Sequence, residues 1–112
     1  MRVLDLTNLS NRKELENNYA GNVIIDFYAD WCGPCTNLAK CFKMLEEENE
    51  FSDLTVLKVN VDSYPELVAE YEVRSLPTMI FSSASKVVKT KIGSLSKNDL
   101  ANMIKETYDY KK

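Results

Sequence analysis

The segment Trp31-Cys32-Gly33-Pro34-Cys35 constrains this chain most, because it places two thiols one helical turn apart. It stands where a continuous apolar run, 23–29, gives way to apolar residues at helical spacing. A run of that length and composition predicts a strand that is covered on both faces. Pro34 suits the first turn of a helix, where the missing N–H of proline costs nothing. We therefore expect the two cysteines at the junction between a buried strand and the start of a helix.

The other apolar patterns predict a mixed α/β fold around this junction. Alternating or β-branched runs predict strands, and apolar residues at helical spacing with polar caps predict helices. Strands are expected over 3–6, 23–29, 54–61, 78–82 and 87–92, and helices over about 11–19, 34–45, 63–71 and 97–108. The last two strands form an antiparallel hairpin. This order implies a central sheet with helices packed over its faces, and the lack of a linker or repeat predicts one domain over 1–112.

Composition excludes several classes of function. The net charge of −3 and the lysines scattered among acidic residues argue against nucleic-acid partners. Residues 1–6 contain no apolar core of a secretion signal, and no apolar run approaches the roughly 20 residues that a membrane-spanning helix needs, so we expect a soluble, cytoplasmic protein with no membrane partner. Three cysteines are too few for a disulfide-stapled secreted scaffold, and the chain has no histidine. Its chemistry must come from cysteine, carboxylates, lysine and backbone groups.

The Cys-x-x-Cys spacing serves disulfide exchange or metal binding, and its surroundings favour exchange. A cysteine at a helix N-terminus meets backbone N–H groups and the positive end of the helix dipole, so Cys32 favours the thiolate that attacks disulfides. Cys35 lies one turn further in, on the apolar face. We expect an outer attacking sulfur and an inner resolving one. A tetrahedral metal site needs four ligands, and the chain offers one further cysteine and no histidine, so no metal or other cofactor is expected.

Three separate motifs resemble those of the thioredoxin family. Residues 26–35 resemble that family's active-site signature, Ser75-Leu76-Pro77-Thr78 resembles its cis-proline loop, and 92–97, with Gly93, resembles the segment before its last helix. Their order and spacing cover nearly the whole chain. The resemblance implies the thioredoxin fold, with a central five-stranded mixed sheet flanked by four helices. It also implies general protein-disulfide reductase activity through dithiol–disulfide exchange.

The resemblance implies roles in proton transfer for two charged residues. Asp26 matches a carboxylate that lies behind the inner cysteine and exchanges protons with it, and Lys58 matches a lysine near that carboxylate. Taken alone, Asp26 within an apolar run should be desolvated, which raises its pKa, unless it is a strand-edge residue facing water. For Lys58, a solvated position on the strand surface is the alternative.

The resemblance also implies a surface that docks target proteins. Pro77 read alone is a trans turn proline, but the matching bond is cis and sets the backbone of Ser75 and Leu76 beside the sulfurs. A target chain then pairs with this backbone as an added strand. Trp31 is either a core aromatic or part of a flat docking surface whose other members are Gly33, Pro34, Val73, Leu76 and Gly93.

The chain departs from the family pattern at three places, and its third cysteine has two interpretations. Lys40 replaces a proline that kinks the active-site helix in many members, so we expect a straighter helix. Tyr28 stands where a Trp or Tyr is usual, and the turn 83–86 lacks the usual glycine.

Cys41 is expected either as a small buried hydrophobe or as a regulatory thiol open to glutathionylation.

The leading hypothesis is a monomeric dithiol carrier that takes electrons from a thioredoxin reductase and passes them to disulfides in target proteins. One alternative is an oxidase or isomerase of the protein disulfide isomerase kind, which usually carries a histidine between the cysteines. The other is a scaffold or chaperone that grips a partner through the surface around Trp31 and Pro77 without turnover. A Cys35→Ser variant separates catalysis from scaffolding, because only catalysis needs release by Cys35.

Overall fold

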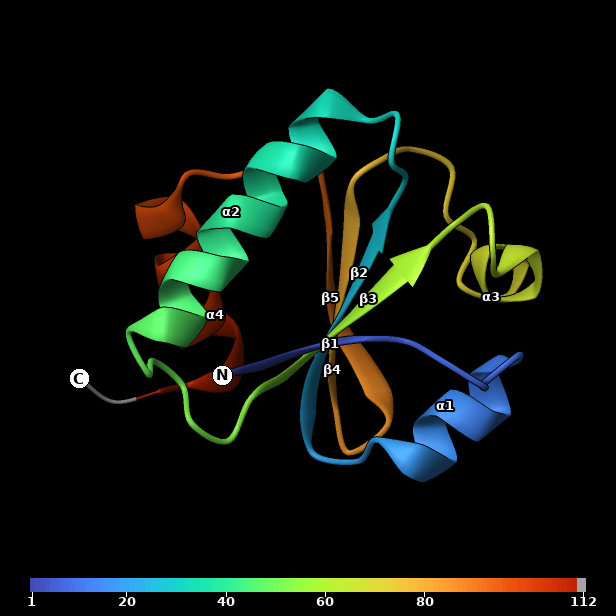
Figure 1. The fold of residues 1–112 in the computed structure, drawn as a ribbon. Helices are drawn as coiled ribbons and strands as arrows, with labels where there is room; N and C mark the ends of the chain where they lie inside the picture. The colour runs from blue at the N-terminus through green and yellow to red at the C-terminus, as the bar shows by residue number, and fades with distance from the viewer. Residues whose placement is uncertain (111–112) are drawn as a thin grey trace.

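The computed structural model describes residues 1–110, and its strands and helices follow the order expected from the apolar patterns (Figure 1). Every expected element is present, and its ends shift by one or two residues at most, as helix and strand boundaries commonly do. The elements are β1 (Arg2–Asp5), α1 (Arg12–Asn18), β2 (Asn22–Tyr28), α2 (Gly33–Glu47), β3 (Thr55–Asn60), α3 (Pro65–Glu70), β4 (Thr78–Ser83), β5 (Lys86–Ile92) and α4 (Lys97–Tyr108).

The strands form one five-stranded mixed sheet in the order β1-β3-β2-β4-β5. Strands β1, β3 and β2 run parallel, whereas β4 is antiparallel to β2 and to β5. Strand β2 is therefore central, which explains why its residues 23–27 are all buried. The predicted thioredoxin fold is confirmed, with five strands and four helices within residues 1–110.

The helices cover the sheet in two layers, with α2 and α4 on one side and α1 and α3 on the other (Figure 1). Successive strand residues point to opposite faces, so each face receives its own core. Ile24 on β2 and Val56 on β3 pack under α2 and α4, while Ile25 and Leu57 pack under α1 and α3. Asp26 lies two residues after Ile24. It therefore belongs to the face that α2 covers.

Polar side chains cap two of the helices at their first turn. Asn11 Oδ1 accepts a hydrogen bond from the backbone N–H of Glu14 at 2.9 Å, and Ser96 Oγ accepts one from that of Asp99 at 3.1 Å. Polar caps at helix starts were among the signals from which these helices were expected. Helix α2 begins differently, because its N-cap residue is Cys32. A reactive sulfur thus occupies the position that usually carries a capping oxygen.

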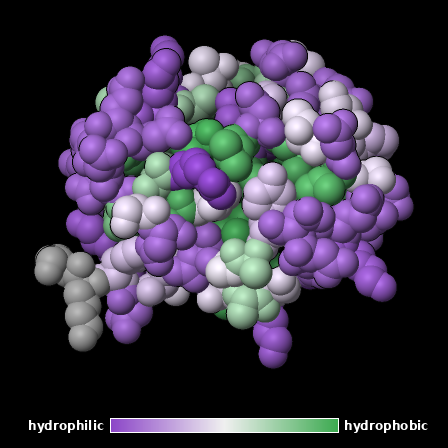
Figure 2. Space-filling view, turned by 60° about the horizontal axis from the view of Figure 1, so that its bottom comes forward, coloured by the Kyte–Doolittle hydropathy of each residue, from purple (hydrophilic) through white to green (hydrophobic). Residues whose placement is uncertain are grey.

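The turn between β4 and β5 closes without glycine. Ala84 and Ser85 both adopt the left-handed region, with φ of 51° and 65°, the pattern of the mirror-image turns that suit two-residue hairpins. Ser85 Oγ donates a hydrogen bond to the carbonyl oxygen of Glu16 at 3.2 Å, which ties the turn to α1. Figure 2 brings this end of the molecule forward, away from the start of α2, and hydrophilic residues surround smaller apolar areas there. Within residues 1–110, no helix combines the length and apolar character needed to cross a membrane.

Candidate active site

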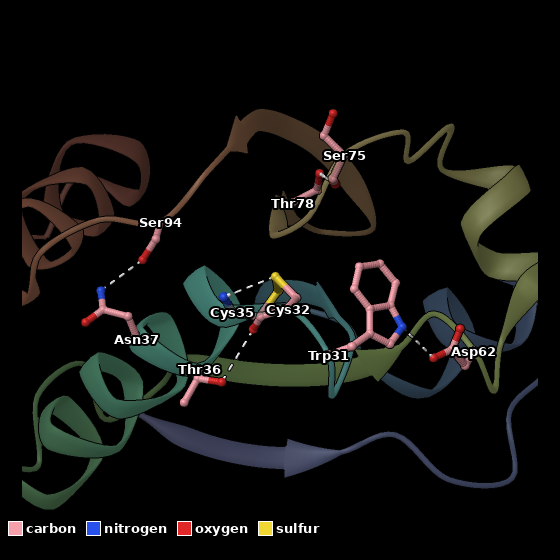
Figure 3. The surroundings of a disulfide bond; sticks show 9 residues. All are labelled: Trp31, Cys32, Cys35, Thr36, Asn37, Asp62, Ser75, Thr78 and Ser94. Atoms are coloured by element: carbon pink, nitrogen blue, oxygen red, sulfur yellow. Dashed lines mark hydrogen bonds between the residues drawn. A yellow bond between two sulfur atoms is a disulfide. The ribbon is translucent and has the colours of Figure 1, made fainter.

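Cys32 and Cys35 form a disulfide at the start of α2, with their Cα atoms 5.3 Å apart. The backbone N–H of Cys35 points at Cys32 Sγ at 3.3 Å, and Thr36 Oγ1 donates to the carbonyl oxygen of Cys32 at 3.4 Å (Figure 3). Cys32 N–H donates to the carbonyl oxygen of Ala29 at 3.2 Å, which anchors the loop to the end of β2. The first turn of the helix therefore holds both sulfurs in place.

The two cysteines differ in their surroundings rather than in their exposure. Their exposed fractions are 6% for Cys32 and 4% for Cys35, so the predicted contrast between an outer and an inner sulfur is nearly absent from exposure in this disulfide state. Cys32 lines an open groove of about 510 Å³, whereas Cys35 lines a smaller cavity of about 170 Å³ that also contacts Lys58. The groove side is reachable by a large partner, and the Cys35 side admits only small groups.

The groove brings together most of the residues predicted to dock a target. It is lined by the predicted Trp31, Gly33, Pro34, Val73, Ser75 and Leu76, together with Cys32, Val61, Val68 and Arg74. Trp31 is 72% exposed, which excludes the core-aromatic alternative. Its indole N–H donates to Asp62 Oδ2 at 3.2 Å and so holds the ring beside the disulfide (Figure 3). The result is an exposed aromatic and apolar surface next to a sulfur.

Two predicted docking residues, Pro77 and Gly93, do not line the groove. The Leu76–Pro77 peptide bond is cis, as the resemblance implied, but the Pro77 side chain is buried. Gly93 adopts φ of 96° and donates its N–H to the carbonyl oxygen of Pro77 at 2.8 Å. Thr78 Oγ1 donates to the carbonyl oxygen of Ser75 at 2.6 Å. These contacts hold the loop from behind, and its preceding residues, Ser75 and Leu76, face the groove.

Asp26 is a buried carboxylic acid without a hydrogen-bond partner. It is 1% exposed, and neither side-chain oxygen has a partner among the described residues. Burial raises the pKa of Asp26 to about 7, and the positive charge of Lys58 only partly opposes this shift. The alternative of a water-facing strand-edge residue is therefore wrong. Near neutral pH, Asp26 is able both to accept and to give up a proton.

Lys58 lies directly beside Asp26 in the sheet register and is half-buried. Its ammonium group sits 4.6 Å from the centre of the Tyr28 ring, a distance that suits a cation–π contact. Lys58 is thus partly covered, and its part in proton transfer stays a prediction. Lys58 and Cys35 line the same small cavity, so a lysine, a buried acid and the inner sulfur share the face of β2 and β3 beneath α2.

Sequence reasoning missed several contacts that shape the site. Asp62 had a partial signal, because residues that follow neighbouring parallel strands meet at one edge, and Trp31 and Asp62 follow β2 and β3. The bond from Asn37 Nδ2 to Ser94 Oγ at 3.1 Å, which joins α2 to the segment after β5, had no sequence signal. In the described part of the chain, no group of three or more Cys, Asp or Glu residues is placed to hold a metal ion.

Cys41 is buried on α2, and its Sγ donates to the carbonyl oxygen of Leu95 at 3.6 Å. Burial raises the pKa of this thiol and so disfavours the reactive thiolate. Of the two interpretations of Cys41, this conformation agrees with a small buried hydrophobic residue.

A disulfide at a helix N-terminus, an adjacent cis-proline loop and a buried acid on the sheet beneath the helix define a dithiol–disulfide oxidoreductase of the thioredoxin fold. Comparison with known proteins agrees. The family model described as Thioredoxin matches residues 2–106, and the chain therefore belongs to the thioredoxin family. Cys32 and Cys35 give it the dithiol–disulfide exchange chemistry of that family, as predicted.

Individual relatives match over most of their length. The chain is 38% identical to thioredoxin of Mycoplasmoides gallisepticum over 102 residues, which cover 89% of this chain and all of that protein. It is 38% identical to thioredoxin of Pyropia yezoensis over 104 residues, or 93% of this chain and 95% of that one. The crystal structure of reduced thioredoxin pre-protein from Schistosoma mansoni matches with a TM-score of 0.77 at 30% identity, covering 96% of this chain and 99% of that one.

Proposed function

We propose that this chain is a general protein-disulfide reductase and electron carrier, acting as a cytoplasmic monomer that folds as one domain over residues 1–112. It receives electrons from a thioredoxin reductase and delivers them to disulfides in target proteins. One observation carries the proposal: the disulfide borders an open apolar groove, and the face of the sheet beneath its helix holds a buried acid whose pKa burial raises to about 7.

The first step joins the carrier to its target. In the reduced protein the Cys32 thiolate, favoured at the N-cap of α2, attacks one sulfur of the target disulfide. A new disulfide forms between Cys32 and the target, the target disulfide breaks, and its second sulfur leaves as a thiolate that takes a proton. The groove beside Cys32 accommodates the target during this step.

The second step releases the target. Ionised Asp26 accepts the proton of the Cys35 thiol, and the resulting thiolate attacks Cys32 Sγ. The Cys32–Cys35 disulfide forms as the mixed disulfide breaks, and the target sulfur that Cys32 had attacked leaves as a thiolate and takes a proton. Two electrons have then passed to the target. Lys58 is proposed to assist by favouring the ionised form of Asp26, a direction that agrees with its electrostatic effect on the pKa of that residue.

Target recognition is proposed to combine contact with a flat apolar surface and hydrogen bonds between the backbones of the carrier and the target. Trp31, Gly33, Pro34, Val73 and Leu76 offer apolar contact, and the backbone of Ser75 and Leu76 offers strand-like hydrogen bonds to an extended target segment. Pro77 and Gly93 act as positioning residues that keep this loop in place. A surface of this kind has few demands on target sequence, which suits a carrier that serves many proteins.

The midpoint potential of the Cys32–Cys35 couple tests the direction of electron flow. The protein is equilibrated in thiol buffers of defined potential, and the alkylated thiols are counted. Thioredoxins themselves supply the reference of about −270 mV, against about −180 mV for protein disulfide isomerase and about −120 mV for a strong oxidant, so these values serve only as a yardstick. A potential near the reducing end supports the proposal. A potential near the oxidising end contradicts it and favours the oxidase or isomerase alternative.

A further inference from the structure

Strand β5 takes no part in the proposed redox cycle. It is last in the sheet order, so within residues 1–110 its outer edge pairs with no other strand. Six of its seven residues are exposed. They include Val87, Val88 and Ile92, with exposed fractions of 41%, 52% and 58%. An exposed strand edge offers free backbone groups that an extended chain is able to pair with.

The register with β4 places two lysines of this strand on the face that α2 and α4 cover. Lys91 pairs with Met79, and Lys89 pairs with Phe81. Met79 and Phe81 both belong to the core beneath α2 and α4. Directly paired residues on neighbouring strands share a face of the sheet. Lys89 and Lys91 therefore project on the α2 and α4 side of the edge.

A bulge adds a third lysine to the same face. Lys86 precedes Lys89 by three residues, and in a regular strand an odd separation points the two side chains to opposite faces. The register shifts between Phe81 and Ser82, however, and brings Lys86 opposite Ser83. Because Ser83 lies two residues from Phe81, it shares the face of Phe81. The shift thus aligns all three lysines of β5 on one side.

These lysines are set apart from the acidic charge of the chain. Residues 86–98 contain four lysines and no acidic residue, whereas the whole chain has a net charge of −3. Among the described residues, none of the three β5 lysines takes part in an ion pair, while Lys97 pairs with Glu48. The edge therefore presents positive charge that no ion pair among the described residues neutralises.

The basic edge ends behind the loop whose residues Ser75 and Leu76 line the groove beside Cys32. Ile92 at the end of β5 pairs with Thr78, and Gly93 bonds to Pro77 behind the groove loop. Ser94 is joined to Asn37 in the first turns of α2, beside the disulfide (Figure 3). With a rise of about 3.3 Å per residue, Lys91 and Lys89 lie roughly 7 and 13 Å along the strand from Gly93. A partner bound at the groove is within reach of both.

We propose that β5 docks target proteins that carry an acidic extended segment a few residues from the disulfide to be reduced. Carboxylates of that segment face Lys86, Lys89 and Lys91, and its alternate apolar side chains lie on the side of Val87 and Ile92. A second copy of β5 is a poor occupant, because lysines would then oppose lysines. The inference rests on the proposed function and adds the class of target that is reduced fastest.

The test uses the full-length protein, reduced beforehand and freed of reductant. Three synthetic peptides share one intramolecular disulfide and differ only in an adjoining arm, in which valine alternates with glutamate, lysine or serine. The second-order rate constant for oxidation of the protein by each peptide is followed by acid quenching and thiol counting. The fluorescence of Trp31, the only tryptophan of the chain, provides a second signal.

We expect the glutamate arm to react about 10-fold faster than the serine arm at low salt, with the lysine arm slowest. This advantage should fall as ionic strength rises from about 20 mM to about 300 mM, since exposed charges are then screened. Lys89→Glu with Lys91→Glu should abolish or reverse the preference for the glutamate arm. The serine arm should react at an unchanged rate, because neither lysine belongs to the site that exchanges disulfides.

A matched control is Lys13→Glu with Lys43→Glu, two exposed lysines on α1 and α2. Both double variants change the net charge from −3 to −7, because each Lys→Glu substitution removes two charge units. The control should keep the full preference for the glutamate arm. Equal loss in the two double variants overturns the inference, since net charge and not β5 would set the preference.

Two further outcomes separate the two kinds of failure. If the serine arm reacts normally and the glutamate arm has no advantage, the lysines only protect the edge and the inference is wrong while the proposed function stands. If no arm reacts, the proposed function itself fails. An oligonucleotide that inhibits the glutamate-arm reaction as strongly as a disulfide-free peptide with the same arm also overturns the inference, because β5 would then bind polyanions without requiring a protein strand.

Discussion

The residues around Cys32 and those around Cys35 differ in chemical character, although the two sulfurs are almost equally buried. On the Cys32 side lies a groove with an exposed indole and no buried charge among its lining residues. On the Cys35 side lie a small cavity, a lysine and, on the strand beneath, a carboxylic acid that is 1% exposed. The Cys32 side is suited to docking a protein, and the Cys35 side is suited to transferring a proton.

This difference locates the functional asymmetry of the pair outside the cysteines. The exposed fractions of 6% and 4% do not by themselves assign an attacking and a resolving sulfur. The neighbours assign them: Trp31 and the cis-proline loop on one side, Asp26 and Lys58 on the other. Changes to either set should therefore affect only one half of the cycle, and changes to the sulfurs should separate the halves completely.

The largest expected effect comes from removing one sulfur at a time. Cys35→Ser should retain attack by Cys32 but lose release, so a covalent complex with the target accumulates and turnover falls by at least about 10³-fold. Cys32→Ser should lose turnover without trapping a target. Non-reducing electrophoresis after mixing with a disulfide-containing protein measures both. Equal trapping by the two variants would contradict the assignment of roles.

Asp26→Asn should change stability in a strongly pH-dependent way. The pKa of Asp26 is near 3.8 in the unfolded chain and about 7 in the folded protein, so the folded protein keeps the proton to higher pH. Between pH 3.8 and about pH 7 the folded state therefore binds more protons than the unfolded state. The free energy of unfolding of the wild type falls as pH rises through this range, and it does not recover at higher pH. At one pKa unit per about 1.4 kcal/mol, the variant should be more stable by about 4 kcal/mol at pH 8 and by almost nothing at pH 3.5.

Urea unfolding at several pH values measures this difference. Asp30→Asn is the matched control, because Asp30 is exposed, and its effect should stay within about 0.5 kcal/mol at every pH. An Asp26→Asn variant that is destabilised at pH 8 would mean that the carboxylate has a partner in the folded protein.

Trp31→Ala should weaken target binding at the groove and leave the chemistry at Cys35 unchanged. The indole is exposed yet held by Asp62 at 3.2 Å, so it offers rigid apolar contact to a target at little entropic cost. We expect KM for protein targets to rise about 10-fold, while Asp62→Asn, which only frees the ring, has a smaller effect. The pH dependence of the release step should be unchanged in both variants. A shift in that pH dependence would show that the two sides are coupled.

Lys58→Met should have the smallest effect and act only on the inner side. The positive charge of Lys58 lowers the pKa of Asp26 against the larger opposing effect of burial, so its removal should raise the pKa of Asp26 further. The pH dependence of target release should then move to higher pH, with KM for targets unchanged. Methionine keeps much of the side-chain volume against Tyr28, which separates the loss of charge from a loss of packing.

Sequence patterns predicted the fold and the centre of the site because both depend on local signals. The apolar run of β2, the caps at Asn11 and Ser96 and the proline at the start of α2 each constrain a few neighbouring residues. The buried position of Asp26 followed from its place in the run. The family resemblance added the cis bond before Pro77 and the neighbour of Asp26 on β3.

What the sequence did not predict depends on contacts between distant segments. The bond from Trp31 to Asp62 and that from Asn37 to Ser94 join loop or helix residues that no periodic pattern links. The bulge that aligns Lys86 with the other β5 lysines is a property of strand pairing, and β5 read alone gives no sign of it. The near-equal burial of the two sulfurs depends on packing with Ala29, Val61 and Leu76, which lie in separate segments of the chain.

The division between a docking side and a proton side is best tested by an NMR titration of the Asp26 side-chain carboxyl in the disulfide form, with carbon-13 labelling and Asp26→Asn to assign the signal. We predict a single transition near the pKa of about 7 that burial imposes on this group. A transition near the ordinary aspartate pKa of 3.8 would contradict this prediction. The inner side of the disulfide would then hold a permanently ionised group at neutral pH, and the division between the two sides would fail.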